Sequence, residues 1–400
     1  MKLNRLFLLS FALLSGVAAV RAEVESAASI FTNANLRVIP ERRTSIIYFQ
    51  CHGLGYGDLS CYGQTNFQTP NLDRLAAEGI RFTNFRPGGT NFTDALAALM
   101  SGKNSGGQKA TTVAERLQLA GYHTGLIGEW TLDEQPWTRG FHEFAGFLNE
   151  QDGRNYYAEK FRRFAPKAWM NDDNTIVDFN RDEVIYENGG GKKAIYLPEF
   201  MFNWTCNFVK NHKPDEFNKY QPFFLLVNLP APHSARAGAD EFPVPSDAPF
   251  SSEAWPQAAK DRASLLTRLD GGVGRLLDQF KQLNITNNIL VIFSSSAAPE
   301  TFADAKLNFL APNGKALAGK NNSPAPLPLI AWWPEGIPGG QVSGFNCSGV
   351  DFAATAVDIG YAKPAKELDG ISILPVLLGK KGIEVDRPTD SLPPTHPTEP

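Results

Sequence analysis

Residues 44–103 read TSIIYFQCHGLGYGDLSCYGQTNFQTPNLDRLAAEGIRFTNFRPGGTNFTDALAALMSGK, and they indicate the architecture of the whole chain. The segment begins with the apolar run IIYF at 46–49, which is typical of a buried parallel strand. Gly53, Gly55 and Gly57 then allow the backbone to turn where a side chain would clash. A tight glycine loop directly after the first strand is how an α/β domain places a site beyond that strand.

A helix and a second strand follow the glycine loop. Thr69 is a good N-cap, Pro70 suits the first helical position, and Gly79 supplies a stop before a strand resumes at Ile80. Further strands are expected at 123–130, 222–229, 289–293 and 327–333, further helices at 112–121, 197–209 and 253–283, and an insertion over the edge of the sheet at 150–195. This alternation predicts a doubly wound, mainly parallel sheet with helices on both faces.

The N-terminus has the pattern of a secretory signal peptide. Lys2 and Arg5 precede an apolar run at 6–20, and small residues allow cleavage after Ala22. The run is shorter than the roughly twenty residues that span a bilayer, so a membrane anchor is the less favoured reading. We therefore expect a secreted or periplasmic protein without membrane attachment after cleavage. The expected parts are a signal peptide at 1–22, a lead-in at 23–43, the α/β domain at 44–380 and a disordered tail at 381–400.

Composition and cysteine content add two limits. A formal net charge of −4 gives no argument for a nucleic-acid partner. An exported chain can form disulfides, and Cys51 and Cys61, which flank one loop, are the most plausible pair. Four separate buried thiols, with Cys206 and Cys347, are the alternative.

One long motif resembles a known family. GLGYGDLSCYGQTNFQTPNLDRLAAEGIRFTNF at 53–85 is similar to the N-terminal signature of the sulfatases, the formylglycine-dependent branch of the alkaline phosphatase superfamily. The segments 351–360 and 368–379 resemble those that close the family's main domain. The resemblance implies the family's α/β fold, with the usual C-terminal subdomain missing or vestigial.

The resemblance also implies a metal site, usually for calcium, and this chain departs from it. The family holds the ion with an Asp pair after the first strand and an Asp-Asn pair after a late strand. The corresponding residues here are His52, Gly53, Ser296 and Ala297, which offer no carboxylate or amide. Calcium requires six to eight oxygen ligands, and His52 alone cannot rebuild a transition-metal site. We therefore expect no bound metal or other cofactor.

The nucleophile position is substituted as well. The segment AALMSGK at 97–103 resembles the helix after the family's formylglycine motif, which places Phe92 where the modified Cys or Ser belongs. A phenyl ring can be neither oxidised to the aldehyde nor made nucleophilic. Thr93 is a weak alternative nucleophile, because it needs activation by a metal or a base and the evident metal site is missing. The competing interpretation is that Thr93 caps a helix, with Asp94 in its first turn.

The sulfate contacts differ in the same way. Glu129 stands where the family has a Lys, and Thr131 where it has a His. An ionised Glu129 about 4 Å from a sulfate would be repulsive by about 4 kcal/mol at an effective dielectric constant of about 20. His233 in NLPAPH matches the family's substrate-contacting His, although a scaffold His at a strand end, fixed by hydrogen bonds, is the favoured interpretation.

These substitutions predict a sulfatase-like pseudoenzyme that binds a sulfated or acidic glycan, or a protein partner. The alternative is a sulfuric- or phosphoric-ester hydrolase with a rearranged site built on Thr93, His52 and His233. Lys and Arg at the mouth of the cleft would favour a glycan, and a broad apolar surface would favour a protein.

Overall fold

The computed structural model describes residues 43–380, except 90, 106, 171–174, 236–240, 300–325 and 364–365. The predicted signal peptide, nearly all of the lead-in and the predicted disordered tail lie outside the described residues. Within the described part, no helix has both the length and the apolar character needed to cross a bilayer.

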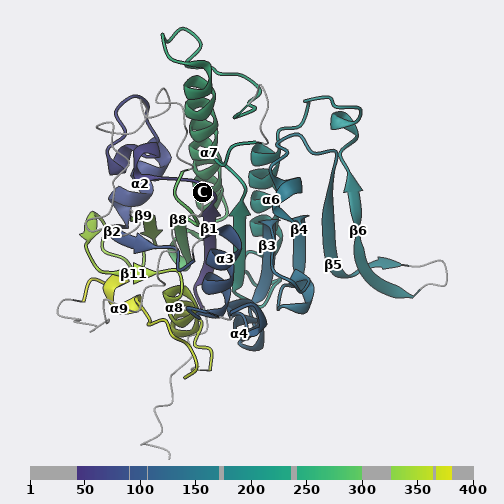
Figure 1. The fold of residues 1–400 in the computed structure, drawn as a ribbon. Coiled ribbons are helices and arrows are strands. Elements are labelled where there is room, and N and C mark those ends of the chain that lie inside the picture. The colour runs from purple at the N-terminus through teal and green to yellow at the C-terminus, as the bar shows by residue number, and fades with distance from the viewer. Residues whose placement is uncertain are drawn as a thin grey trace, which may run out of the picture. The chain divides into compact units, whose positions relative to one another are not determined.

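The centre of the fold is an 11-stranded sheet built around β1 (Ser45–Cys51) (Figure 1). The strand order is β10-β2-β9-β8-β1-β7-β3-β4-β5-β6, with β11 paired to β2. The other strands are β2 (Ile80–Arg86), β3 (His123–Glu129), β4 (Glu143–Phe147), β5 (Lys160–Met170), β6 (Ile176–Val184), β7 (Phe223–Leu229), β8 (Ile289–Ser295), β9 (Leu327–Trp332), β10 (Gln341–Ser343) and β11 (Cys347–Ser348). The strands β8, β1, β7, β3 and β4 form a continuous parallel core.

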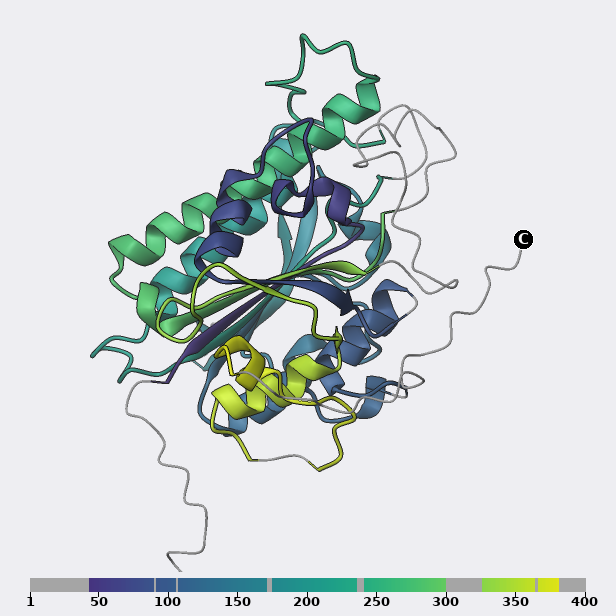
Figure 2. The same cartoon turned by 90° about the vertical axis from the view of Figure 1, so that its left-hand side faces the viewer.

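Helices cover both faces of this sheet, as the sequence predicts. They are α2 (Pro70–Glu78), α3 (Phe92–Ser101), α4 (Val113–Leu119), α5 (Glu150–Gly153), α6 (Leu197–His212), α7 (Gln257–Gln282), α8 (Asp351–Ile359) and α9 (Leu374–Leu377). Side chains of β1 alternate between two cores: Ile47 and Phe49 pack with α2, α6 and α7, whereas Ile46 and Tyr48 pack with α3, α4 and α8. Figure 2 shows the two helical layers on opposite sides of the sheet.

Two sheet regions differ from the expectation. The segment 150–195 does not cover the edge of the sheet: its β5–β6 hairpin extends the sheet antiparallel beyond β4. The sequence pattern is uninformative there because many hairpin residues are exposed and charged. Strand β9 is antiparallel to both β2 and β8, so the sheet is mixed around its parallel core.

The local predictions have mixed outcomes. The helix predicted at 112–121 forms as α4, and Thr112 and Glu115 make a capping box at its start. Thr93 does not cap α3, because that helix begins one residue earlier and Asn91 accepts the hydrogen bond from Asp94 N. Cys51 and Cys61 are not joined by a disulfide.

Candidate functional site

The candidate site lies where the carboxyl ends of three neighbouring strands meet. Cys51 of β1 is in register with Leu229 of β7 and with Ser295 of β8, so the residues that follow these strands converge. They enclose a cavity of about 460 Å³. Its lining comprises His52, Asn91, Phe92, Thr93, Asp94, Glu150, Arg154, His233, Ala297 and Ala298. The structure thus brings His52, Phe92, Thr93 and His233 to one place, as the sequence predicts for a single site.

His52 forms the inner wall of the cavity as an uncharged imidazole. Its ring stacks on Phe92 with centroids 4.5 Å apart and lies 4.2 Å from the His233 ring. Burial, together with His233 and Arg154, lowers the pKa of His52 to about 2. Its Nδ1 is buried and has no hydrogen-bond partner within the described residues. Phe92, which the sequence resemblance assigns to the nucleophile position, therefore packs against the imidazole.

His233 is held in one tautomer by its neighbours. Its Nδ1–H donates to Ser234 O at 2.8 Å, while Arg154 Nη2 donates to its Nε2 at 3.2 Å. Tyr156 Oη donates to the His233 carbonyl at 2.6 Å. Because Arg154 can only donate, Nε2 of His233 is the acceptor of this bond and carries the lone pair.

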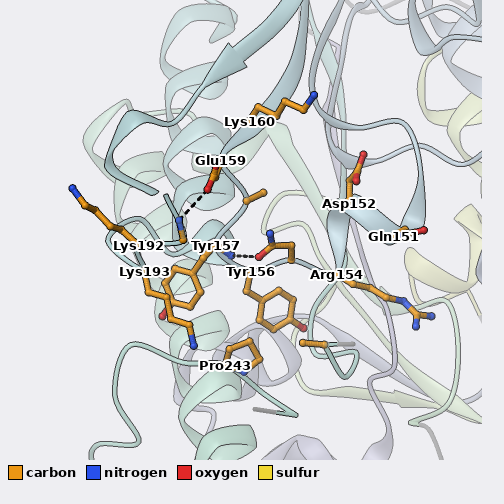
Figure 3. A pocket seen from close by; sticks show the side chains of 14 residues that line it. Gln151, Asp152, Arg154, Tyr156, Tyr157, Glu159, Lys160, Lys192, Lys193 and Pro243 are labelled. Carbon is orange, nitrogen blue, oxygen red and sulfur yellow. Dashed lines mark hydrogen bonds between the residues drawn. The ribbon is translucent and has the colours of Figure 1, made fainter. Parts of the chain in front are cut away.

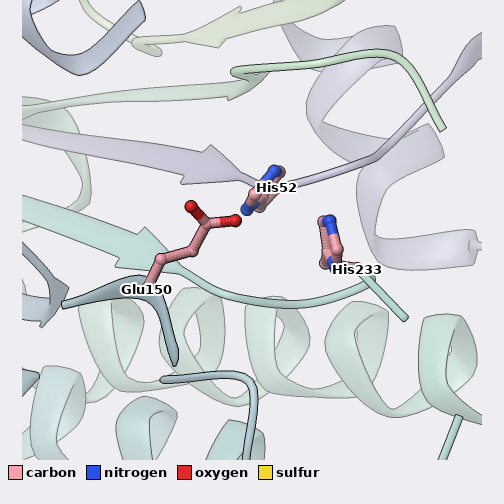
Figure 4. Close-up of side chains that lie close together, drawn as sticks. All are labelled: His52, Glu150 and His233. Atoms are coloured by element: carbon pink, nitrogen blue, oxygen red, sulfur yellow. The ribbon is translucent and has the colours of Figure 1, made fainter. Parts of the chain in front are cut away.

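Glu150 and Arg154, which sequence reasoning missed, complete this wall from the short helix α5. Figure 4 shows the Glu150 carboxylate facing His52 and His233. One ligand atom from each of these three residues lies within 4.8 Å of the others, so the partners that His52 needs for a metal site are present after all. Arg154 forms an ion pair with Glu150 and also contacts His233. A permanent cation therefore already balances this carboxylate, which disfavours an additional positive ion.

Calcium does not fit the residues at the family's ligand positions. Ser296 Oγ donates to Cys51 O at 3.2 Å, and Ser295 Oγ donates to Ala297 O at 2.7 Å, so both hydroxyls are engaged internally. Gly53 adopts φ +82, a left-handed conformation that disfavours the Asp found in the family. The four expected positions supply no carboxylate or amide side chain, whereas calcium takes six to eight oxygen ligands, mostly from such groups.

The Thr93 hydroxyl is paired with another hydroxyl and not with a base. The hydrogen bond of Thr93 Oγ1 runs to Thr131 Oγ1 at 2.8 Å. Among the described residues, none of the hydrogen bonds of Thr93 joins its hydroxyl to His52 or His233, although all three line the same cavity. The convergence required by the rearranged hydrolase is therefore incomplete.

Glu129 does not act as the expected repulsive charge. Its side chain is completely buried, it is absent from the cavity lining, and neither carboxyl oxygen has a hydrogen-bond partner among the described residues. Burial and nearby Glu150 raise the pKa of Glu129 well above its ordinary value, while Arg154 acts in the opposite direction. The uncharged acid packs against Gly153, where any side chain would collide with it. The repulsion expected from the sequence is therefore wrong, because the group is neutral and enclosed.

A buried ion pair supports the loops that carry the cavity. Arg262 of α7 binds Asp58 through Nε at 3.0 Å and Nη2 at 2.8 Å. The same guanidinium donates to Gly53 O and Pro232 O, each at 3.0 Å. Arg262 thus joins the loop after β1 to the loop after β7. Its position was not predicted, since only the fold brings these segments together.

A second, larger pocket of about 590 Å³ shares Arg154 with the first cavity. Its cationic lining is Arg154, Lys160, Lys192 and Lys193, and its acidic lining is Asp152 and Glu159. Tyr156 and Tyr157 lie between Lys193 and Arg154 (Figure 3). The Lys193 ammonium is 5.7 Å from the Tyr157 ring centroid. We call these two adjoining spaces the inner cavity and the basic pocket.

Comparisons with known proteins agree with this architecture. Human N-acetylgalactosamine-6-sulfatase is 27% identical over 386 residues, covering 86% of this chain and 67% of the relative. The crystal structure of Ps i-CgsB with k-i-k-neocarrahexaose aligns with a TM-score of 0.63 at 24% identity, covering 84% of this chain and 77% of that one. A protein called BT4656, solved with its substrate D-glucosamine-2-N,6-O-disulfate, aligns with a TM-score of 0.59 at 20% identity, covering 84% and 80%.

The family model described as Sulfatase matches residues 45–360, which include the whole parallel core and both strand ends that carry His52 and His233. These structural likenesses show the fold, and the family match extends over most of the chain. The chain belongs to the sulfatase family.

Proposed function

We propose that this chain is an exported pseudosulfatase that binds a sulfated or acidic glycan without hydrolysing it. The observation that carries the proposal is the Phe92 ring, which stacks on His52 at the place of the family's nucleophile. The residues at the expected calcium positions support it, because they offer no carboxylate or amide and the Ser296 hydroxyl donates to Cys51 O. We therefore propose that the family's calcium is not needed by this protein.

The basic pocket supports a glycan in preference to a protein partner. Four cationic side chains and two acidic ones line it, next to the buried Tyr156 and Tyr157. Its volume of about 590 Å³ falls in the usual range of about 300 to 1,000 Å³ for small-molecule sites. Relatives named for sulfated amino sugars make a sulfated glycan the preferred ligand class.

The competing function, an ester hydrolase with a rearranged site, has less support. It requires a base at the Thr93 hydroxyl, but that hydroxyl bonds to another threonine. His52 and His233 are near each other, yet Arg154 and Ser234 engage the two ring nitrogens of His233. Turnover that depends on Thr93 would establish this alternative.

Glycan binding can be tested by calorimetry with a hexasaccharide that contains N-acetylgalactosamine 6-sulfate. We expect the sulfated probe to bind, the unsulfated hexasaccharide to bind much more weakly, and added salt to reduce the affinity. The double variant Lys192→Ala/Lys193→Ala should lose about tenfold in affinity, equivalent to about 1.4 kcal/mol.

A matched control distinguishes the effect of removing lysines from the basic pocket from the effect of lowering the protein's net charge. Lys210 and Lys281 are exposed on α6 and α7 and do not line the basic pocket, so Lys210→Ala/Lys281→Ala removes the same charge elsewhere. It should bind as the unmodified protein does. Equal losses in the two double variants, or equal affinity for the unsulfated sugar, would contradict a built glycan site.

A further inference from the structure

A second histidine cluster lies at the amino-terminal ends of the parallel strands, whereas the inner cavity lies at their carboxyl ends. His123 is the first residue of β3, Glu143 is the first residue of β4, and His212 is the last residue of α6. Strands β3 and β4 pair in parallel, and Figure 1 shows α6 lying beside them. The inner cavity is formed by residues after strand ends, whereas this cluster is formed at strand beginnings. The two places are therefore separate.

The cluster has the geometry of a three-ligand site. Nε2 of His123 lies 3.0 Å from Glu143 Oε1, and Nε2 of His212 lies 2.8 Å from the same oxygen. One ligand atom from each residue lies within 4.8 Å of the other two. Their side chains are 20%, 34% and 21% exposed for His123, Glu143 and His212, so an ion can enter from solvent without unfolding.

Neighbouring rings hold the two imidazoles in position. The His123 ring is stacked between His142, at a centroid distance of 4.9 Å, and His212, at 3.9 Å. Phe208 packs on His212 at 4.5 Å. His142 is not one of the ligands. Its Nδ1 accepts a hydrogen bond from Thr124 N at 3.1 Å, and its Nε2 lies 3.2 Å from Gln118 Nε2.

The Glu143 carboxylate has no permanently charged partner among the described residues, which favours the binding of a cation. Among the described residues, both ion-pair partners of Glu143 are imidazoles, and neither a Lys nor an Arg pairs with it. The C-terminus of the 16-residue helix α6 adds further negative potential. At the inner cavity, by contrast, Arg154 already balances Glu150.

We propose that His123, Glu143 and His212 bind a divalent transition-metal ion of the zinc type. Two imidazole nitrogens and one carboxylate oxygen match the ligand preference of zinc, with water completing a tetrahedral site. Binding requires each Nε2 to present its lone pair, with the ring proton on Nδ1. The ion would fasten the end of α6 to the beginnings of β3 and β4. This site is independent of the glycan-binding function proposed above.

The test uses the full-length, tag-free protein, freed of metal by a chelator and titrated with zinc in a calorimeter. The wild-type protein should bind one zinc ion per chain at this site, and cobalt should give the visible absorption of a tetrahedral complex. Loss of supporting residues alone costs metal sites about 10- to 100-fold in affinity, so Glu143→Gln and His212→Gln should each lose at least about 100-fold. Near-ultraviolet circular dichroism checks that both variants are folded.

His142→Gln is the matched control, since it removes an imidazole from the same stack without removing a ligand. It should lose clearly less zinc affinity than His212→Gln, because it removes a supporting ring and no ligand. Failure of the wild type to bind zinc, or unchanged binding in Glu143→Gln and His212→Gln, would overturn the proposal. A loss in His142→Gln equal to that in His212→Gln would also overturn it, because the stack and not the three ligands would then govern binding.

Discussion

Two ionisable side chains around the inner cavity are uncharged, and each depends on burial. His52 is a neutral imidazole against Phe92, and Glu129 is a neutral acid behind α5. A buried charge without a partner is costly, so the protein lowers the pKa of the base and raises that of the acid. Neither side chain therefore contributes a charge to the inner cavity, whose charged lining is Asp94, Glu150 and Arg154.

The variant Glu129→Gln tests the protonation of Glu129 directly. The folded-state pKa of Glu129 is raised, so its contribution to stability is fully present below the unfolded pKa of about 4.3 and is lost as pH rises toward the folded value. The amide in the variant does not titrate. The free energy of unfolding of Glu129→Gln minus that of the wild type should therefore increase from about pH 5 to about pH 8. Denaturation curves at both pH values give this difference, and a constant or falling difference would contradict a neutral Glu129.

Only some of the residues that line the inner cavity could be predicted from the sequence. Phe92, His52 and His233 follow from aligned motifs next to predicted strands, and the structure places all three on one cavity. Glu150 and Arg154 lie on a four-residue helix and at its end, in a segment without apolar periodicity, so nothing in the sequence pattern indicated their role. The burial of Glu129 also depends on the packing of that helix.

Among the elements, α7 does most to position the candidate site. Its Arg262 is 4% exposed and bonds to Asp58 and to two loop carbonyls. Removing one member of a buried pair leaves the other charge uncompensated. We expect Arg262→Ala to reduce the free energy of unfolding by about 3 to 5 kcal/mol in urea denaturation.

The control for this experiment is an exposed ion pair on another helix. Arg74 and Glu78 form an i,i+4 pair on α2, and pairs of this kind contribute about 0.3 to 0.5 kcal/mol. Arg74→Ala should therefore change stability little. If the two variants lost similar stability, Arg262 would not be holding the site loops as described.

Helices and strands could be predicted where burial requires either a continuous run of apolar residues or apolar residues at helical spacing. The apolar runs of β1, β7 and β8 and the core stripe of α7 are such cases, and all four elements form. The β5–β6 hairpin was not predicted because it extends an edge of the sheet, where side chains face solvent on much of their length. The antiparallel direction of β9 is likewise set by topology, which a local pattern does not encode.

The molecule has the fold of its family, whereas its residues differ at the positions where the resemblance places catalysis and metal binding. The parallel core, two helical layers and converging strand ends agree with the family match over residues 45–360. At the positions that the sequence resemblance assigns to the nucleophile, the metal ligands and the sulfate-contacting Lys, however, the chain has Phe92, then His52, Gly53, Ser296 and Ala297, and then Glu129. The selectivity of these changes is the basis of the proposed loss of hydrolysis.

The most direct measurement of that loss is the rate at which the purified mature protein hydrolyses an aryl sulfate and an aryl phosphate, with and without added calcium. Thr93→Ala is the control, because Thr93 is the remaining hydroxyl nearest the family's nucleophile position. We predict no turnover above the buffer rate for either ester, no effect of calcium, and no difference between the wild type and Thr93→Ala. Turnover that calcium stimulates, or that disappears in Thr93→Ala, would contradict the account.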